Sequence, residues 1–401
     1  MIAEFKPSKL YGSIDAPPSK SMAHRYLIGA ALSQKRCKIK GIDFNEDILA
    51  TIDCLKALGA DIHIENDVVL INPDGFMKNV DAPVLNCRES GSTLRFFIPL
   101  VLCLEKDVIM SGSARLFERP LDVYEELCGK HNFMFKKDVG SLAICGKLKS
   151  GCYEIRGDIS SQFITGLIFA LVYLNEESSI QILPPFESRP YVNLTISALN
   201  SFGARIEYVD EYKLVIKKSV LHSYEGSIEG DYSNAAFLDA FNYLGSKVTV
   251  NNLLPNSLQG DKIYKEYFEK IEEGTPTLDI SNCPDLGPIL FAMAALKNGA
   301  QFTGTDRLKV KESDRGMAMK EELQKLGGEL ILGENMIIVP KQELCNNGII
   351  LQGHNDHRIV MAISVILSKI GGKLVGIEAV KKSYPRFFED LMQLGAEIKI
   401  D

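Results

Sequence analysis

The chain has 401 residues, of which 46% are hydrophobic and 24% charged. These values are typical of a globular protein and exclude a disordered chain, a collagen-like fibre and a coiled coil, while the length predicts roughly two or three domains. The formal net charge of −7 excludes an overall positive field, so we expect neither nucleic acid nor an acidic membrane as a partner.

The chain start and the cysteines indicate a cytoplasmic protein. Residues 1–6 lack the pattern of a signal peptide, and the apolar stretches 164–174, 289–296 and 359–367 are shorter than the ~20 residues that span a bilayer. The nine cysteines are scattered, with no C-x-x-C pair, and the six histidines are not spaced with them as ligand sets. We therefore expect reduced thiols and no metal.

A recurring junction divides the chain into similar segments. An apolar helix end, a glycine and an alternating strand-like stretch recur clearly at Gly59, Gly203, Gly327 and Gly395, and more weakly at Gly129 and Gly274. These six glycines are 70, 74, 71, 53 and 68 residues apart. Glycine suits the left-handed position after a helix, and the alternation suits a half-buried strand. The spacing favours six equivalent α/β units over the unrelated junctions of any α/β protein.

Two segments are candidate crossings between domains. Residues 17–19 (PPS) are stiff, whereas residues 225–231 (EGSIEGD) are polar and flexible. If the chain crosses at both, one lobe comprises residues 18–229, and the other comprises residues 1–17 plus 230–401. Each lobe would hold three units, and a cleft between them would be a natural ligand site.

The first candidate site motif is residues 17–25 (PPSKSMAHR), which enter an apolar stretch. Ser19 or Ser21 can cap the predicted helix, and Lys20 at its start adds positive charge. Arg25 lies one turn beyond Ser21 on the same face. A capped surface helix with two solvated cations is the alternative.

Two further motifs follow. Residues 86–95 (NCRESGSTLR) join hydroxyls to Gly91, which lets a phosphate approach the backbone at a helix start. Residues 118–121 (ERPL) predict Pro120 at the first helical position, with Arg119 just before it. Taken alone, each is also typical of an ordinary turn into a helix.

Two hydroxyl-rich helix starts come next. Residues 157–162 (GDISSQ) precede the buried stretch that begins at residue 163 and offer hydroxyl, amide and backbone donors to an anion. Residues 187–191 (ESRPY) add a hydroxyl and an aromatic ring at another helix start. Simple capping by Ser160 is the alternative explanation for the first.

The C-terminal half carries four charged helix starts. Residues 283–288 (CPDLGP) place a carboxylate before an apolar helix, and residues 311–315 (KESDR), 355–358 (NDHR) and 381–385 (KKSYP) each carry Lys or Arg. A charge run is usually a solvated face. Four such starts in one lobe favour a site.

Eight of these motifs resemble those of the enolpyruvyl transferases, specifically the branch that acts on shikimate 3-phosphate. They run in the family's order from residue 17 to residue 385 and are Ser19-Lys20-Ser21 with Arg25, Ser90-Gly91-Ser92 with Arg95, Arg119-Pro120, Ser160-Ser161-Gln162, Asp285, Lys311-Glu312-Ser313-Asp314-Arg315, Asn355-Asp356-His357-Arg358 and Lys382. The KESDR and NDHR sequences together make the resemblance specific.

The resemblance implies an α/β fold of two lobes, each with three βαβαββ units, that is, an inside-out α/β barrel with the active site between the lobes. It implies that the 5-hydroxyl of shikimate 3-phosphate adds to C2 of phosphoenolpyruvate and that phosphate is then eliminated, on the route to chorismate and the aromatic amino acids. No organic cofactor is needed, because phosphoenolpyruvate is itself the activated reactant. We expect a monomer.

The resemblance also assigns roles by position. The catalytic residues would be Asp285 as base for the 5-hydroxyl, Glu312 for proton transfer at C3 and Lys20 for phosphate departure. Shikimate 3-phosphate would contact Lys20, Ser21, Arg25, Ser160, Ser161, Gln162, Ser188, Asp285 and Lys311. Phosphoenolpyruvate would contact Lys20, Gly91, Arg119, Gln162, Arg315, Arg358 and Lys382. Arg95, Tyr191 and His357 would support these residues.

Some positions depart from the family. Many members have Pro-Gly where this chain has Pro17-Pro18, Gly-Asn where it has Arg88-Glu89, and Pro where it has Phe96. These differences bear on the phosphoenolpyruvate pocket, and therefore on sensitivity to glyphosate, which occupies that pocket in the family.

Two alternatives remain. The branch that acts on UDP-N-acetylglucosamine would have Lys-Asn in place of Lys20-Ser21 and a cysteine shortly before Arg119-Pro120, whereas residues 114–118 (ARLFE) contain none. A non-catalytic, anion-binding paralogue would have lost an acid or a cation, yet Asp285, Glu312 and Lys20 are all present.

Overall fold

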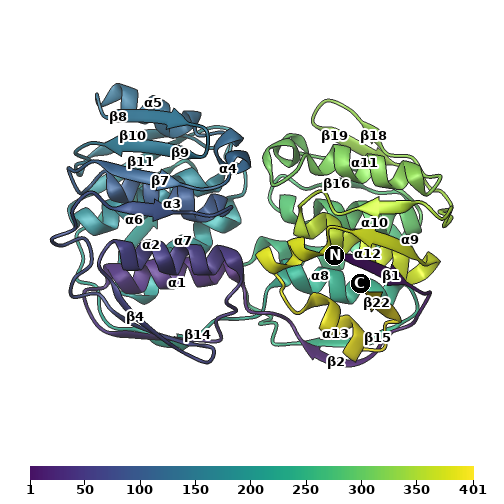
Figure 1. The fold of residues 1–401 in the computed structure, drawn as a ribbon. Helices are drawn as coiled ribbons and strands as arrows, with labels where there is room; N and C mark the ends of the chain where they lie inside the picture. The colour runs from purple at the N-terminus through teal and green to yellow at the C-terminus, as the bar shows by residue number, and fades with distance from the viewer. The chain divides into compact units, whose positions relative to one another are not determined.

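The computed structural model describes residues 1–401, and the chain divides into two compact units. The continuous unit is Pro18–Glu229, and the discontinuous unit is Met1–Pro17 with Gly230–Asp401. Figure 1 labels most of the helices and strands of both. Each unit is described by itself below.

The continuous unit contains three four-stranded sheets of one design. Their strand orders are β14-β3-β5-β4, β6-β7-β9-β8 and β10-β11-β13-β12. In each sheet the first two strands are parallel and the remaining neighbours antiparallel. The elements are β3 (Cys37–Lys40), β4 (Asp61–Glu65), β5 (Val68–Asn72), β6 (Val84–Asn86), β7 (Val108–Ser111), β8 (Met134–Asp138), β9 (Ser141–Cys145), β10 (Cys152–Arg156), β11 (Ser178–Leu183), β12 (Arg205–Tyr208), β13 (Lys213–Lys217), β14 (Glu225–Ser227), α1 (Lys20–Leu32), α2 (Glu46–Ala57), α3 (Gly91–Val101), α4 (Ala114–Glu118), α5 (Asp122–Lys130), α6 (Ser161–Leu174) and α7 (Arg189–Ser201).

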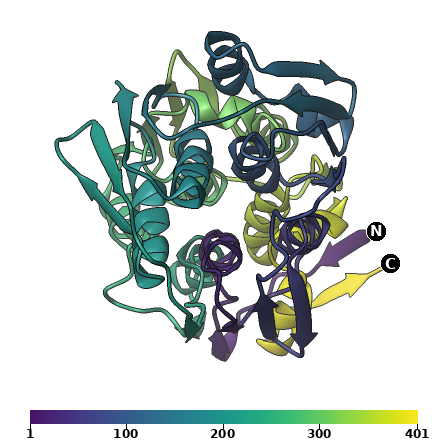
Figure 2. The ribbon, with the colours of Figure 1, turned by 90° about the vertical axis from the view of Figure 1, so that its left-hand side faces the viewer.

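The sheets lie around the helices of this unit. Figure 2 looks onto the continuous unit, with α1 in purple seen almost end-on and the sheets toward the outside. Residues 163–172 of α6 are all buried, as expected for a helix that is apolar on every side and enclosed by protein. Helix α3 packs closely along α6, because Gly166 leaves room for the carbonyl of Arg95 and the hydroxyl of Tyr124.

The discontinuous unit has two four-stranded sheets and one parallel pair. The orders are β20-β21-β1-β22, β16-β17-β19-β18 and β15-β2. Its elements are β1 (Ile2–Phe5), β2 (Tyr11–Asp15), β15 (Lys247–Asn251), β16 (Thr277–Asp279), β17 (Ala300–Thr303), β18 (Ile331–Leu332), β19 (Met336–Val339), β20 (Ile350–Gln352), β21 (Gly372–Val375), β22 (Ile398–Ile400), α8 (Tyr232–Tyr243), α9 (Tyr264–Glu273), α10 (Gly287–Leu296), α11 (Arg315–Lys325), α12 (His357–Ile370), α13 (Phe387–Gln393) and the 3₁₀ helices η1 (Gly260–Ile263), η2 (Pro284–Leu286), η3 (Asp306–Val310) and η4 (Ile377–Lys382).

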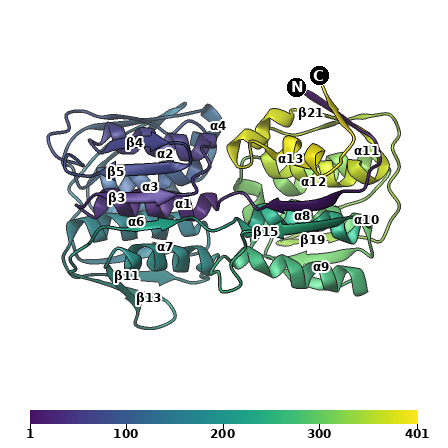
Figure 3. The same ribbon diagram turned by 90° about the horizontal axis from the view of Figure 1, so that it is seen from below.

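The N-terminal strands complete two sheets of the discontinuous unit. Strand β1 lies between β21 and β22, and β2 pairs with β15. Figure 3 shows the two chain ends side by side, where the amide N–H of Ile2 donates to the carbonyl oxygen of Asp401. The third sheet is reduced to two strands, because α9 leads directly into β16 of the next sheet.

The predicted α/β class is confirmed, and none of the helices is long and apolar enough to span a bilayer.

The repeat glycines follow the sequence prediction at four positions and depart from it at two. The φ angle is +92° at Gly59, +94° at Gly203, +80° at Gly327 and +101° at Gly395, the left-handed conformation that glycine adopts after a helix. The prediction was wrong for the two weaker copies. Gly129 lies inside α5, and Gly274 has an extended φ of 178°.

The predicted helix start at Pro120 was also wrong. Helix α5 begins at Asp122, with Leu121 at its N-cap position. Arg119 instead ends α4 with an extended backbone, φ −67° and ψ 150°. A residue before proline is disfavoured in the helical conformation, so Pro120 ends one helix and does not start the next.

We predict that Gly166→Ala destabilises the protein by about 1–3 kcal/mol, because the added methyl group would overlap the Arg95 carbonyl and force α3 away from α6. Gly129→Ala is the matched control, since no atom lies within 4 Å of the added carbon and alanine favours the helix by up to about 1 kcal/mol. Urea unfolding of both variants measures the difference. Equal stability of the two would contradict this account of the α3–α6 contact.

Candidate active site

Four helices of the continuous unit begin close together. Lys20, the first residue of α1, has its Nζ 2.8 Å from the Asp47 carboxylate in the first turn of α2. The Thr93 hydroxyl oxygen of α3 lies 3.4 Å from the Asp47 carbonyl oxygen, and the Gln162 amide of α6 donates to the Ser92 hydroxyl at 2.9 Å. Helix starts carry unsatisfied N–H groups and positive dipole ends, so this arrangement suits an anion.

The Arg25 guanidinium is buried beside these helix starts. Its Nε donates to the Thr195 hydroxyl at 2.8 Å, and its other nitrogens donate to the carbonyls of Ser21 at 2.6 Å and Tyr191 at 2.9 Å. The Phe96 ring centroid lies 5.5 Å from the guanidinium carbon. Burial lowers the pKa of Arg25 to about 10, which still leaves it charged at neutral pH. Because these hydrogen bonds go to neutral oxygens, the positive charge remains available to an anion.

Two more arginines lie near the start of α3, namely Arg95 within the helix and Arg119 beside its first residue. Arg95 donates to the Gln162 side-chain oxygen at 2.6 Å and to the Pro120 carbonyl at 2.9 Å. The buried Arg119 approaches Gly91 so closely that a side-chain carbon on Gly91 would lie 2.6 Å from its NH1. Glycine at position 91 is therefore what allows a cation to lie against the first residue of this helix.

The predicted serines lie at the starts of α6 and α7. Ser160 caps α6 by accepting a hydrogen bond from the Gln162 N–H at 3.3 Å, and Ser161 is the first residue of that helix. Ser188 is buried at the N-cap of α7 with a left-handed φ of 53°. Since α6 and α7 pack together, these hydroxyl groups belong to the same part of the unit as Arg25.

Sequence reasoning missed a buried hydrogen-bond chain that joins α1, α2 and α3. His24 Nδ1 lies 2.8 Å from the Thr51 hydroxyl, which lies 2.8 Å from the Thr93 hydroxyl, which in turn donates to the Ser90 hydroxyl at 2.8 Å. Burial, followed by the positive charge of Lys20, holds the pKa of His24 well below its usual value, so this histidine is neutral. The chain fixes the first motif relative to the second.

In the discontinuous unit, three predicted cations surround Asp285. Its Oδ1 lies 3.1 Å from Lys311 Nζ and 3.0 Å from Arg315 NH1, and its Oδ2 lies 3.3 Å from Arg358 NH2. These residues come from three of the predicted motifs. The structure therefore brings the CPDLGP, KESDR and NDHR motifs into one cluster.

Arg315 links all the acids of this cluster. Its NH2 lies 2.7 Å from the Glu312 carboxylate, and its Nε lies 2.9 Å from Asp356 Oδ2. The Ser313 hydroxyl also donates to Asp356, at 3.1 Å. With its third contact to Asp285, the Arg315 guanidinium holds both predicted proton-transfer acids, Asp285 and Glu312.

The cluster lowers the pKa of both Asp285 and Lys311. Burial opposes ionisation of Asp285, but Lys311, Arg358 and Arg315 hold the pKa of this carboxyl well below its usual value. Burial lowers the pKa of Lys311; Arg315 and Arg307 lower it as well, and Asp285 and Glu312 oppose them, with a net pKa of about 8. The surrounding cations therefore keep Asp285 ionised, and burial above all makes the Lys311 ammonium easier to deprotonate.

The remaining predicted residues lie beside this cluster. Lys382 Nζ donates to the Asn355 carbonyl at 2.7 Å, next to the NDHR motif. His357 is buried as the first residue of α12. Arg358 donates to the Ser233 hydroxyl at 2.9 Å, which ties the start of α12 to the start of α8.

Three partners of the predicted residues were not themselves predicted as site residues. Asp47 pairs with Lys20, Asp356 holds Arg315 and caps α12, and Ser233 contacts Arg358. The polar residues before α2 could have indicated a capped helix at Asn45, but nothing in the sequence indicates that Asp47 faces Lys20. Each of these contacts joins residues far apart in the chain.

One of the positions at which this chain differs from many family members has a visible structural consequence. Arg88 has a left-handed φ of 51°, at the position where many members of the family have glycine. Its guanidinium lies 2.5 Å from Glu46 and 2.8 Å from Asp53, both on α2. These ion pairs tie the segment before Gly91 to α2, whereas glycine would adopt the same backbone conformation without them.

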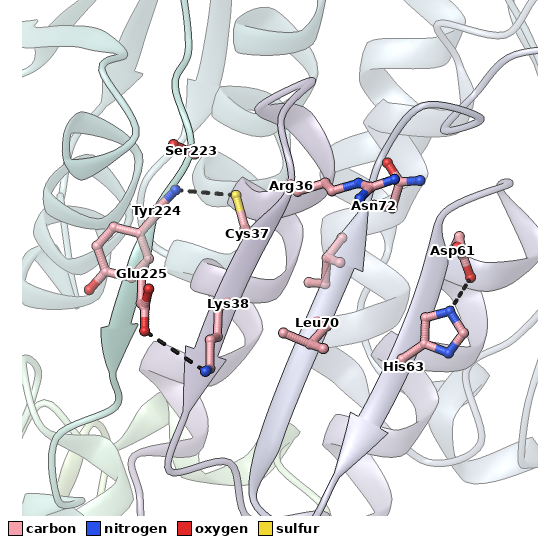
Figure 4. A pocket seen from close by; sticks show the side chains of 11 residues that line it. Arg36, Cys37, Lys38, Asp61, His63, Leu70, Asn72, Ser223, Tyr224 and Glu225 are labelled. Carbon is pink, nitrogen blue, oxygen red and sulfur yellow. Dashed lines mark hydrogen bonds and ion pairs between the residues drawn. The ribbon is translucent and has the colours of Figure 1, made fainter.

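Two surface hollows of the continuous unit contain none of the predicted residues. One, of about 480 Å³, lies on the outer face of the sheet β14-β3-β5-β4. Figure 4 shows Glu225 directed toward Lys38 and Asp61 toward His63, at 4.0 and 3.2 Å. The other, of about 570 Å³, lies beside α5 and β10. Because none of the predicted motif residues lines either hollow, the helix starts are the better candidate site.

Comparison with known proteins decides the family. The sequence model of EPSP synthase (3-phosphoshikimate 1-carboxyvinyltransferase) matches residues 5–391. The chain belongs to this family. It is 41% identical to the 3-phosphoshikimate 1-carboxyvinyltransferase of Clostridium kluyveri, over 98% of this chain and 97% of that protein. It is 38% identical to the protein of the same name from Clostridium perfringens strain ATCC 13124, over 98% of each.

The fold agrees with this assignment. The solved EPSP synthase of Acinetobacter baumannii superposes with a TM-score of 0.80 and covers 100% of this chain and 99% of its own. The sequence identity is 22%, so this likeness concerns the fold alone. The enolpyruvyl transferase resemblance noted in the sequence is confirmed.

Proposed function

We propose that this protein transfers the enolpyruvyl group of phosphoenolpyruvate to the 5-hydroxyl of shikimate 3-phosphate, giving 5-enolpyruvylshikimate 3-phosphate and phosphate. The family match over residues 5–391 carries the proposal. Asp285, ionised among three cations from the family motifs, supports it. The reaction belongs to the route to chorismate and the aromatic amino acids. The nine unpaired cysteines favour a reducing compartment, and we place the enzyme in the cytoplasm as a monomer.

The chemistry requires three proton transfers and one departure of phosphate. Asp285 accepts the proton of the 5-hydroxyl as that oxygen bonds to C2 of phosphoenolpyruvate, and Glu312 delivers a proton to C3. Glu312 then removes a proton from C3 while the C2–O bond to phosphate breaks, assisted by the positive charge of Lys20. General acid–base steps of this kind contribute about 10²–10⁴-fold each.

The low pKa of Asp285 suits this role once the substrates are bound. A carboxylate held ionised by three cations is a weak base in the free enzyme. Lys311, Arg315 and Arg358 are also residues that we propose to bind the substrate anions. Phosphate and carboxylate groups next to these cations offset their charge, which raises the pKa of Asp285 when a base is needed.

The two substrates divide the remaining residues between them. We propose that shikimate 3-phosphate contacts Lys20, Ser21, Arg25, Ser160, Ser161, Gln162, Ser188, Asp285 and Lys311. Phosphoenolpyruvate contacts Lys20, Gly91, Arg119, Gln162, Arg315, Arg358 and Lys382. Arg95, Tyr191 and His357 orient these groups.

The purified protein should release phosphate from phosphoenolpyruvate when shikimate 3-phosphate is supplied, because the proposed contacts bind the 3-phosphate of this acceptor and place its 5-hydroxyl for attack. A coupled phosphate assay with each candidate acceptor measures this. Phosphoenolpyruvate without an acceptor is the control. Release with UDP-N-acetylglucosamine in place of shikimate 3-phosphate would overturn the proposal.

Asp285→Asn should lower turnover by about 10²–10⁴-fold, because the amide keeps the shape of the side chain but cannot accept the hydroxyl proton. Phosphoenolpyruvate should still raise the melting temperature of this variant, since Arg315 and Arg358 remain. Glu343→Gln, at an exposed position of the same unit, is the control. An Asp285→Asn enzyme with turnover close to that of the parent would rule out Asp285 as the base.

The specificity constant kcat/KM for shikimate 3-phosphate should fall as pH rises through about 8. This constant reports groups of the free enzyme, and the pKa of Lys311 there is about 8, so the ammonium that attracts the substrate phosphate is lost above that pH. In Lys311→Arg the charge persists, because arginine stays protonated, and the profile should be flatter between about pH 7 and 9.5. An equal fall in both enzymes would assign the titration to another group.

A further inference from the structure

A buried carboxylate on α11 lies outside the residues considered so far. The Glu322 side chain is 1% exposed. Its oxygens lie 2.7 and 2.9 Å from Lys325 Nζ, and they also accept hydrogen bonds from the Gln352 N–H at 3.0 Å and from His354 Nε2 at 2.6 Å. Burial opposes its ionisation, but the hydrogen bonds from His354, Lys325 and Gln352 lower the pKa of Glu322. The group is therefore a charged acceptor with several donors.

The donors at residues 352 and 354 belong to a segment with an unusual backbone. His354 and Asn355 both have left-handed conformations, with φ of 50° and 51°. Each such residue costs of order 1 kcal/mol or more unless its surroundings enforce it. Glu322 holds this segment on both sides of Gly353, through the backbone at Gln352 and the side chain at His354. Residues 353–355 form a bend in the backbone, and these two hydrogen bonds act directly on it.

The bend determines where three proposed contacts to phosphoenolpyruvate lie. The Asn355 carbonyl accepts from Lys382 Nζ at 2.7 Å. The next residue, Asp356, accepts from Arg315 Nε at 2.9 Å and from the backbone N–H of Arg358 at 2.9 Å. Residue 355 is thus hydrogen-bonded to Lys382, and residue 356 to Arg315 and Arg358. A shift of the bend would move all three.

We propose that Glu322 and His354 are positioning residues for phosphoenolpyruvate, which act by holding the bend at residues 353–355. Helix α11 carries Arg315 at its start and Glu322 two turns later, so the same rigid element holds both a binding cation and the segment that orients the other two. The inference rests on the proposed function. It goes further by assigning a role to a buried acid that touches neither substrate.

The same cluster includes Glu321, and together Glu321, Glu322 and His354 place three potential metal-ligand atoms within 4.8 Å of one another. The Lys325 ammonium lies against both oxygens of Glu322 and already supplies a positive charge there. Glu321 is exposed, and its carboxylate is 4.0 Å from His354 Nε2. These contacts favour a cluster held together by side chains, in which Lys325 and Glu322 fix His354. Glu321, exposed on the same helix, is a matched control.

Glu322→Gln should raise the KM for phosphoenolpyruvate by about tenfold, the order expected when a hydrogen bond to a charged group is lost. The KM for shikimate 3-phosphate should change by no more than about twofold, since the residues proposed to bind it are not hydrogen-bonded to the bend. Glu321→Gln should leave both constants unchanged. Steady-state kinetics with each substrate varied in turn measures the three enzymes.

His354→Asn removes the hydrogen bond between residue 354 and Glu322 without removing the acid. Asparagine adopts the left-handed conformation readily, so the backbone remains accessible, but its side chain is too short to reach Glu322. We expect the same selective rise in the KM for phosphoenolpyruvate. This variant also serves as the test if Glu322→Gln fails to fold.

The outcomes separate the two proposals. A parent enzyme that releases no phosphate with both substrates would overturn the proposed function, and with it this inference. An active parent with an unchanged KM for phosphoenolpyruvate in both folded variants would overturn the inference alone. An equal rise in both KM values would also overturn it, because it would indicate a general structural role.

Discussion

The buried guanidinium of Arg315 is the interaction on which the geometry of the discontinuous unit depends. Its side chain is 1% exposed, and a buried charge without partners costs several kcal/mol. Three carboxylates surround it: Glu312 in the preceding turn, Asp285 before α10 and Asp356 at the start of α12. Although burial opposes ionisation, these acids raise the pKa of Arg315. Because each acid comes from a different segment, satisfying one cation fixes the relative positions of three helix starts.

The distribution of the cations explains how an acidic protein can bind two anions. The net charge of −7 describes the whole chain, but the proposed site motifs contain eight cations, namely Lys20, Arg25, Arg95, Arg119, Lys311, Arg315, Arg358 and Lys382. In the free protein, acids such as Asp47 and Asp285 partly neutralise them. A bound phosphate or carboxylate can take over this role, since helix dipoles and cations favour it at the same place. The local field, and not the total charge, therefore governs binding.

Local signals in the sequence predicted local structure well. Ser160 caps α6, the alternative considered for its motif, because capping involves only the next few residues. Ser19 lies at the N-cap position of α1, as predicted, but makes no side-chain capping hydrogen bond. The errors have local causes too. Pro120 ends α4 instead of starting α5, and Gly129 lies within a helix, since glycine and proline occur both inside and between elements. The motif order sufficed to indicate the family.

What the sequence by itself determined is the α/β class, the family and the helix starts to which we assign the chemistry, because alternation, capping and motif order are written in neighbouring residues. Only the tertiary structure decided which acid meets which cation. Asp285 reaches Lys311, Arg315 and Arg358 across 26, 30 and 73 residues, and Glu322 reaches His354 across 32. Such pairs depend on how helices pack, and packing is set by the shapes of many buried side chains together, which no local pattern records.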